Sequence, residues 1–382
     1  MIIPQAIIPA RADAALESGL FCGAQARIDL TALRHNFRRL HARAPDTRVM
    51  AMLKADAYGH GALHCARALA CADAFAVARL SEAQQLREAG IRQKILLLPG
   101  VFSMDELGFA AQLQLDICVH QSQQLELLEQ AHGLKLGVWL KINTGMNRLG
   151  FDLGVAGAVS KRLLTCPALR TPLRIMTHLA DADKPGSAKT REQIQALRGC
   201  AIDGVELSIA NSAGVLAWPD AYQDWLRPGI SLYGVSPFTD DCGADHGLRP
   251  VMRFTTRLID VKTIPQGGAV GYGSTWVAPR EMRIGAAAVG YADGYPRHLP
   301  SGTPVMINDQ RASLIGRVSM DIISLDLEHC PAARMGDEVL LWGPELAVEI
   351  IARAAGSIGY ELVARVGPRV RRTINQDGSN IE

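Results

Sequence analysis

The sequence predicts an α/β protein: a (β/α)8 barrel of the TIM type followed by a mostly β C-terminal domain. Between residues 49 and 234, short apolar runs alternate with longer amphipathic runs, which is the pattern of parallel strands joined by helices. Eight such strand-like runs fall within about 190 residues, and no glycine fingerprint of a dinucleotide fold follows the first. We therefore expect a closed barrel rather than an open sheet.

The elements of the barrel can be assigned in chain order. Residues 1–25 form an N-terminal extension in which only residues 6–9 resemble a strand. A helix is expected from Asp29 to Ala44, with Asp29 as its N-cap, and residues 81–90 and 190–199 are examples of the later helices. The predicted barrel strands are 50–53, 74–78, 95–99, 116–120, 137–142, 173–179, 205–210 and 226–234.

From about residue 248 the long helical patterns end, and strand-like runs alternate with turns. One late helix is predicted at 346–356. We therefore divide the chain into the extension (1–25), the barrel (26–245) and the mostly β domain (246–382). The strands predicted for the last domain are 253–264, 285–292, 303–309, 312–318, 321–327 and 337–343.

The composition excludes several classes of protein. With 48% hydrophobic and 20% charged residues, the chain has the composition of a globular protein. The net charge of +2 gives no indication of nucleic acid or of an anionic membrane as a partner. The apolar runs are too short to span a bilayer, and the N-terminus is a poor signal peptide. The eight cysteines are scattered without a C-x-x-C pair, which predicts reduced thiols and a cytoplasmic location.

The stretch VMAMLKADAYGHG, residues 49–61, carries the strongest chemical signal. An apolar strand leads directly into Lys54, after which glycines and Asp56 predict a loop and then a helix over 60–70. Burial would lower the pKa of the Lys54 amine, and a neutral amine is the form that attacks a carbonyl to make a Schiff base. Taken alone, Lys54 could equally be a strand-end lysine whose amine reaches solvent.

Other polar residues follow the predicted strands at their carboxyl ends, where barrel enzymes place their active sites. Lys141 ends the fifth predicted strand and His178 the sixth. Asn211 and Ser212 follow the seventh, and Arg227 lies in the eighth. We expect these side chains to gather at one rim. Two histidines four residues apart, His60 and His64, have no third ligand at a recognisable spacing, so no metal site is predicted.

The stretch LKADAYGHG, residues 53–61, resembles the cofactor-lysine signature of the alanine racemases, enzymes that use pyridoxal 5′-phosphate. Matching blocks recur from about Ala26 to Tyr360. The resemblance implies interconversion of L- and D-alanine on an external aldimine of the cofactor, for peptidoglycan synthesis or alanine catabolism. Lys54 would be the base for the face that exchanges with D-alanine, and Tyr272 the base for the face that exchanges with L-alanine.

The same resemblance implies the residues that bind the cofactor. Ser212 would hold the phosphate together with the backbone amides of Gly229 and Ile230, although Ser212 alone could equally be a helix N-cap. Arg227 would face the ring nitrogen and disfavour its protonation, because a guanidinium is always charged and only donates hydrogen bonds. The remaining residues that match cofactor contacts are Tyr58, His178 and Tyr360, of which His178 alone could be a core histidine.

The substrate would be held by residues of two protomers. In the block KINTGMNRLG, Arg148 matches the arginine that contacts the substrate carboxylate. Lys141 matches a lysine that is often carbamylated, and an unmodified lysine remains an open alternative. Tyr272 and Met320 match residues that a neighbouring subunit contributes, which implies a homodimer with shared active sites. Positions that match the access corridor are Asp183, Tyr291, Arg297 and Arg317.

The sequence departs from the family at its C-terminus, where Arg371 follows Val370 in place of the usual proline. Alternative functions are a broad-specificity racemase, a related pyridoxal phosphate-dependent decarboxylase and a non-catalytic carrier of the cofactor. A decarboxylase would be expected to carry an acidic residue at the ring nitrogen instead of Arg227. A carrier would need neither the second domain nor Tyr272.

Overall fold

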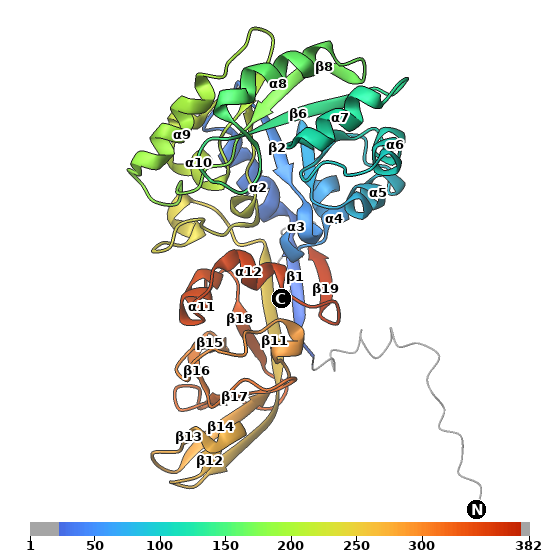
Figure 1. The fold of residues 1–382 in the computed structure, drawn as a ribbon. Helices are drawn as coiled ribbons and strands as arrows, with labels where there is room; N and C mark the ends of the chain where they lie inside the picture. The colour runs from blue at the N-terminus through green and yellow to red at the C-terminus, as the bar shows by residue number, and fades with distance from the viewer. Residues whose placement is uncertain (1–22, 376–382) are drawn as a thin grey trace, which may run out of the picture. The chain divides into compact units, whose positions relative to one another are not determined.

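A computed structural model describes residues 23–375, which form two compact units (Figure 1). The barrel unit comprises Ile28–Met252 and Ala347–Ala364. The sheet unit comprises Arg253–Leu346, Arg365–Thr373 and the described residues before Ile28. The strand expected at 6–9 lies outside the described residues. The segment Ala347–Ala364 belongs to the barrel unit, although the sequence placed it in the second domain, and the limits predicted near residues 25 and 245 stay predictions.

The predicted barrel is present. Its strands pair side by side in parallel, and the last pairs with the first through the register Trp225–Arg48 and Leu226–Val49, so the sheet closes. A further short strand, β7 (Phe151–Asp152), pairs with the end of the fifth barrel strand. The barrel strands are β2 (Arg48–Met52), β3 (Ala74–Val77), β4 (Lys94–Leu97), β5 (Asp116–Val119), β6 (Leu136–Asn143), β8 (Leu169–Met176), β9 (Glu206–Ser208) and β10 (Trp225–Leu226).

The last barrel strand is shorter than predicted. The sequence indicated a strand over 226–234, but β10 ends at Leu226 and the 3-10 helix η2 (Ile230–Tyr233) follows. Pro228 lacks a backbone N–H and cannot continue a strand ladder, and the short 229–234 segment folds back instead. This break brings the backbone of Gly229 to the rim of the barrel.

The helices follow the strands as predicted, with two exceptions. Asp29 caps α2 (Leu30–His41), since its carboxylate accepts hydrogen bonds from the amides of Thr31 and Ala32 at 2.7 and 2.9 Å. The segment after Lys54, predicted as a loop, is labelled α3 (Lys54–Gly59), but Ala55 to Tyr58 have left-handed backbone angles and do not form a regular α-helix. The helix α12 (Gly359–Ala364) was not predicted. The others are α4 (Ala62–Ala68), α5 (Leu80–Glu88), α6 (Met104–Gln112), α7 (Ser122–Gln130), α8 (Leu153–Thr165), α9 (Ala188–Arg198), α10 (Ser212–Ala217) and α11 (Val348–Ala354).

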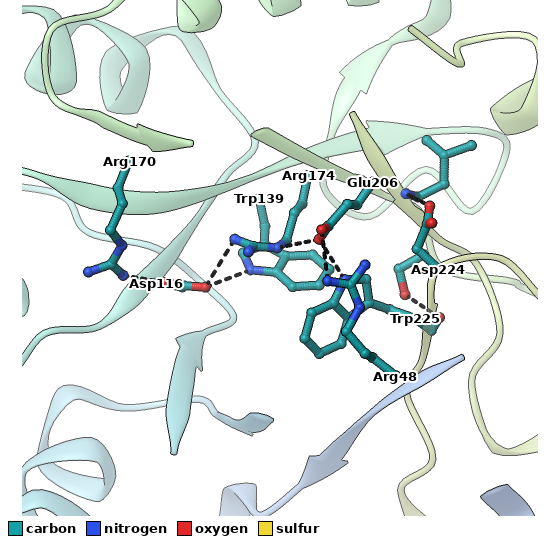
Figure 2. Close-up of polar contacts among 10 residues, drawn as sticks. Arg48, Asp116, Trp139, Arg170, Arg174, Glu206, Asp224 and Trp225 are labelled. Atoms are coloured by element: carbon teal, nitrogen blue, oxygen red, sulfur yellow. Dashed lines mark hydrogen bonds and ion pairs between the residues drawn. The ribbon is translucent and has the colours of Figure 1, made fainter. Parts of the chain in front are cut away.

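A partly buried ion network closes the end of the barrel where the strands begin (Figure 2). Arg174 of β8 bonds Glu206 at 2.8 Å and Asp116 at 3.4 Å, and these carboxylates stand at the first positions of β9 and β5. Arg170 and Arg48 pair with them, and two tryptophan N–H groups donate to the same carboxylates. We call this set the floor network: Arg48, Asp116, Trp139, Arg170, Arg174, Glu206 and Trp225.

The sheet unit is built around a sheet with the strand order β14-β17-β16-β15-β18-β11-β1-β19, in which the pairs from β14 to β11 are antiparallel. A separate hairpin of β12 (Ala269–Val270) and β13 (Trp276–Val277) carries Tyr272 in its turn. The sheet strands are β1 (Gln25–Asp29), β11 (Met252–Ile264), β14 (Met282–Ala287), β15 (Pro304–Ile307), β16 (Gln310–Ile315), β17 (Ile323–Asp326), β18 (Glu338–Trp342) and β19 (Arg371–Asn375).

Candidate active site

A cavity of about 420 Å³ opens at the end of the barrel opposite the floor network, where the strands end. Every predicted cofactor or substrate residue of the barrel unit lines it. Lys54 follows β2, His178 follows β8 and Arg227 follows β10 directly. The predicted residues that line this rim cavity are Lys54, Tyr58, Lys141, Arg148, His178, Ser212, Arg227, Gly229, Ile230 and Tyr360.

The charged side chains that line the rim cavity are all basic. Among the described residues that line it, the charged groups are two lysines and two arginines, and no aspartate or glutamate lies between them. Arg227 and Lys141 are buried, with only 3% and 9% of their surfaces exposed. Burial of a cation without an acidic partner costs free energy unless a bound anion neutralises it. The cavity is therefore suited to a ligand with more than one negative group.

Arg227 is held rigidly by backbone and side-chain acceptors. One terminal nitrogen donates to the carbonyls of Thr177 and Ile209, the latter at 3.2 Å, and the other donates to the Ser208 hydroxyl. Burial lowers the pKa of the Arg227 guanidinium to about 10, which leaves it charged at neutral pH. The guanidinium group of Arg227 thus places a fixed positive charge at the cavity wall.

Ser212 and Gly229 form a small polar cradle at the rim. The Ser212 hydroxyl oxygen accepts hydrogen bonds from the amide of Gly229 at 2.8 Å and that of Ser231 at 3.3 Å. The N-cap of α10 is Asn211, which accepts from Gly214, so Ser212 has no capping role. A Cβ atom at Gly229 would lie 2.6 Å from the Tyr58 hydroxyl oxygen. Only glycine lets the Tyr58 phenol come this close to the cradle.

The titratable side chains of the cavity are shifted toward their neutral forms. Burial first, and the charge of Arg148 second, lower the pKa of the Lys54 amine, whereas the charge of Glu82 raises it. Burial and the neighbouring cations lower the pKa of Lys141, and they lower that of His178 to about 3. Burial also raises the pKa values of the Tyr58 and Tyr360 phenols, so both stay protonated as donors.

Tyr272 and Met320 belong to the sheet unit and are strongly exposed there. Tyr272 is 68% exposed on its hairpin turn, and Met320 is 52% exposed. The carbonyl of Met320 accepts a hydrogen bond from the amide of Ala292 at 3.1 Å, which ties its loop to the loop that carries Tyr291. Neither residue lines the rim cavity as it forms within the barrel unit.

The apolar wall of the cavity was not predicted as part of the site. Met52, Leu98 and Met176 line it, and they stand at or just beyond the ends of β2, β4 and β8. The rule that located Lys54 would also have found them, because every strand of a parallel barrel ends at the same rim. In the sequence, however, an apolar residue at a strand end looks the same as a residue of the core.

The two histidines considered as metal ligands lie apart from any cluster. The ring of His60 stacks on Tyr233 at 4.5 Å, and its Nδ1 lies 3.0 Å from the carbonyl of Ala57. Within residues 23–375 no three histidine, cysteine or acidic side chains come close enough to hold a metal ion. No helix in this range is long and apolar enough to cross a membrane.

Comparisons with known proteins agree with this architecture. Residues 28–237 match the model of the alanine racemase N-terminal domain, and residues 251–374 match that of the C-terminal domain. The alanine racemase of Nitrosococcus oceani is 49% identical over 92% of this chain and 99% of its own length. The crystal structure of the biosynthetic alanine racemase of Pseudomonas aeruginosa is 44% identical, with a TM-score of 0.90 over 93% of this chain and all of that one. The structure from Acinetobacter baumannii is 38% identical with a TM-score of 0.87, over 93% of this chain and all of its own.

Proposed function

Because the chain belongs to the alanine racemase family and interconverts the two enantiomers of alanine, we propose that its rim cavity binds pyridoxal 5′-phosphate through Lys54. The observation that carries this proposal is the gathering of Lys54, Arg148 and Arg227 in one cavity without an acidic residue among those described. We further propose that two protomers share each active site. The cytoplasmic location stays a prediction from the sequence.

The residues present fit this cofactor. Ser212, the amides of Gly229 and Ile230, and the phenols of Tyr58 and Tyr360 would hold the phosphate. Tyr58 and Tyr360 lie with their ring centroids 6.2 Å apart, so both can reach one anion. Arg227 would face the ring nitrogen, with His178 beside it. When bound, pyridoxal phosphate would be linked to the Lys54 amine and would withdraw electrons from the substrate α-carbon.

Lys54 would serve as one of the two bases. Burial and Arg148 lower the pKa of its amine, so a larger fraction is neutral near pH 7 and can accept a proton at Nζ. We assign it the face of the α-carbon that exchanges with D-alanine. Arg148, an exposed residue of the cavity wall, would hold the substrate carboxylate with its planar fork.

Lys141 would orient Arg148. Its side chain is buried among cations, and burial lowers the pKa of its amine. Carbamylation of the neutral amine would turn Lys141 into an anion and would offset the positive charge of Arg148 and Arg227. We propose this modification, which mass spectrometry of the intact chain can detect as an added carbon dioxide that acid removes.

Tyr272 of the partner subunit would serve as the second base, for the face that exchanges with L-alanine. The side chains of Tyr272 and Met320 are among the large hydrophobic residues exposed on the sheet unit, and the others are Val277, Tyr291, Ile322 and Met335. Exposed apolar side chains that gather on a surface are typical of a protein interface. A two-fold axis would bring each such surface to the other protomer and make two equivalent sites. The backbone of Met320 would then contact the substrate carboxylate.

Replacement of the cofactor lysine tests the proposed attachment. Lys54→Ala protein should fold, should lack the visible absorbance of lysine-linked cofactor and should lose racemisation by a factor of at least about 1,000. Borohydride reduction followed by peptide mapping of the wild-type protein should label the peptide that contains Lys54. A label on another peptide would contradict the assignment.

A further inference from the structure

The segment that joins Lys54 to Tyr58 has an unusual backbone. Ala55, Asp56, Ala57 and Tyr58 have φ angles of 54°, 51°, 54° and 55°, so four successive residues with side chains lie in the left-handed region. L-residues disfavour this region, and they adopt it in succession only where the surroundings impose it. The turn places its first and last side chains, Lys54 and Tyr58, in the same cavity.

Two of the contacts that hold this turn lie toward its end at Tyr58. The Asp56 carboxylate accepts a hydrogen bond from the amide of Ala62 at 2.7 Å. Gly59 follows at a φ of 81°, and a Cβ atom there would lie 2.2 Å from the carbonyl oxygen of Val363. These contacts fix the end of the turn near Tyr58. They do not involve Ala55, the residue that follows Lys54.

At the Lys54 end, the carbonyl of Leu53 accepts a hydrogen bond from the amide of Ala57 at 2.8 Å, and a second contact comes from another element. Glu82 is the third residue of α5, and one of its carboxylate oxygens accepts a hydrogen bond from the amide of Ala55 at 2.7 Å. The other oxygen accepts from the amides of Ala78 and Arg79 at 2.8 and 3.0 Å. A single side chain therefore connects the loop after β2 to the loop after β3.

We propose that Glu82 is a positioning residue for the racemase: it anchors the left-handed turn at Ala55 and thereby sets the direction of the Lys54 side chain. This inference rests on the proposed function, since it assumes that Lys54 carries the cofactor. Glu82 does not line the rim cavity among the described residues, so it acts through the backbone of Ala55. Its negative charge also acts on Lys54, because it raises the pKa of the amine.

A purely local role can be separated from this one, because the chain provides a matched residue. Glu106 is the third residue of α6, the next helix, and its carboxylate accepts from the amide of Phe102 in its own loop at 2.7 Å. A glutamate at this position commonly stabilises the start of its helix. Glu82 and Glu106 share that role, and Glu82 adds to it a hydrogen bond from the turn that follows Lys54.

The test compares Glu82→Gln with Glu106→Gln. The side-chain amide of the Glu82→Gln variant has a single oxygen, which can accept from Ala55 or from the α5 loop but not from both, so the connection between the loops is lost. A hydrogen bond to a charged group is worth enough to change an equilibrium about 10-fold to 100-fold. We expect the dissociation constant of pyridoxal phosphate, measured by absorbance on the apoprotein, to rise at least about tenfold in Glu82→Gln. Glu106→Gln should bind the cofactor as the wild type does.

A second readout is the pH dependence of cofactor attachment. The groups that act on the Lys54 amine are Arg148 and Glu82, with Lys141 and His178 across the cavity. Loss of the Glu82 charge should lower the pKa of the amine, so the pH midpoint of the attachment rate should move to lower pH in Glu82→Gln. Helix capping alone would not move this midpoint.

Glu82→Asp keeps the experiment decisive if Glu82→Gln does not fold. The shorter carboxylate keeps the charge but cannot span both loops, so cofactor affinity should fall while the pH midpoint stays near that of the wild type. Wild-type affinity in both Glu82 variants, or equal losses in Glu82→Gln and Glu106→Gln, would overturn the positioning role. If the wild-type protein attaches the cofactor at a residue other than Lys54, the proposed function fails instead.

Discussion

Arg227 presents a permanent charge where the cofactor ring nitrogen is proposed to lie. Its guanidinium is held by the carbonyls of Thr177 and Ile209 and by Ser208, so it cannot turn away. A fixed cation opposes protonation of the ring nitrogen, which makes the ring a weaker electron sink. The arginine should therefore suppress side reactions that need a more strongly stabilised carbanion.

A neutral replacement tests the role of this charge. Arg227→Gln should allow the ring nitrogen to be protonated, which makes the ring a stronger electron sink and lets the carbanion take up its proton away from the α-carbon. It should also increase the transfer of the amino group from alanine to the cofactor, which is measured as pyruvate formed per racemisation event. Arg227→Lys keeps a positive charge and should form little pyruvate. The same ratio of pyruvate to racemisation in all three proteins would show that Arg227 does not face the ring.

At the level of single residues, the sequence was informative where a residue type is unusual for its place. A lysine or arginine at the end of an apolar strand is such a case, and Lys54, Lys141 and Arg227 all line the rim cavity. Glu82 could not be recognised in this way. A glutamate at the start of a helix is ordinary, and its contact with Ala55 depends on two loops being neighbours in the barrel.

At the level of elements, the strands of the barrel were predictable because each is short, apolar and followed by a helix. The turn α3 was not, since sequences of this kind do not indicate a left-handed backbone for Ala55 to Tyr58. The length of β10 was overestimated because the apolar residues of η2 continue its pattern beyond Pro228. In both cases tertiary contacts override the local preference of the chain.

At the same level, the floor network predicts how the stability of the barrel depends on pH in the acid range. Burial by itself would raise the pKa of Glu206, but hydrogen bonds from Trp225 and Arg48 and the charge of Arg174 lower it below its ordinary value. A carboxyl group whose folded pKa is lowered stabilises the fold at neutral pH, and this contribution is lost as the pH falls through the folded pKa. The stabilisation from Glu206 should therefore be complete at pH 7, should begin to fall near the ordinary glutamate pKa of about 4.3, and should be lost as the pH falls through the lower folded pKa.

Glu206→Gln tests this prediction in urea unfolding at one fixed protein concentration. At pH 7 the variant should be less stable than the wild type by about 1–3 kcal/mol, because three donors lose a charged acceptor. The difference should persist down to about pH 5 and should shrink as the pH falls below about 4. Glu129→Gln, which breaks the exposed pair with Arg162, is the matched control and should cost less than about 1 kcal/mol. A deficit that stays the same as the pH falls from 7 to well below about 4 would contradict the account.

At the level of the whole molecule, the residues proposed for one reaction are divided between two compact units. Lys54 lies in the barrel unit, and Tyr272 and Met320 lie in the sheet unit, where they are exposed. The sequence could predict this division because the two units have different patterns. It could not by itself say which protomer supplies Tyr272, and the resemblance to the racemases supplied that prediction.

Complementation between two inactive variants tests the shared site most directly. Lys54→Ala and Tyr272→Phe homodimers should each be nearly inactive. In a mixed dimer with shared sites, one site collects both substitutions and the other collects neither. Exchange of subunits at equal concentrations should make about half of the dimers mixed and restore roughly a quarter of wild-type sites. The measurement is D-alanine formation after exchange, with two affinity tags to show that mixed dimers form. Recovery of about a quarter of wild-type activity is the predicted result, and mixed dimers without activity would show that Tyr272 acts within its own chain.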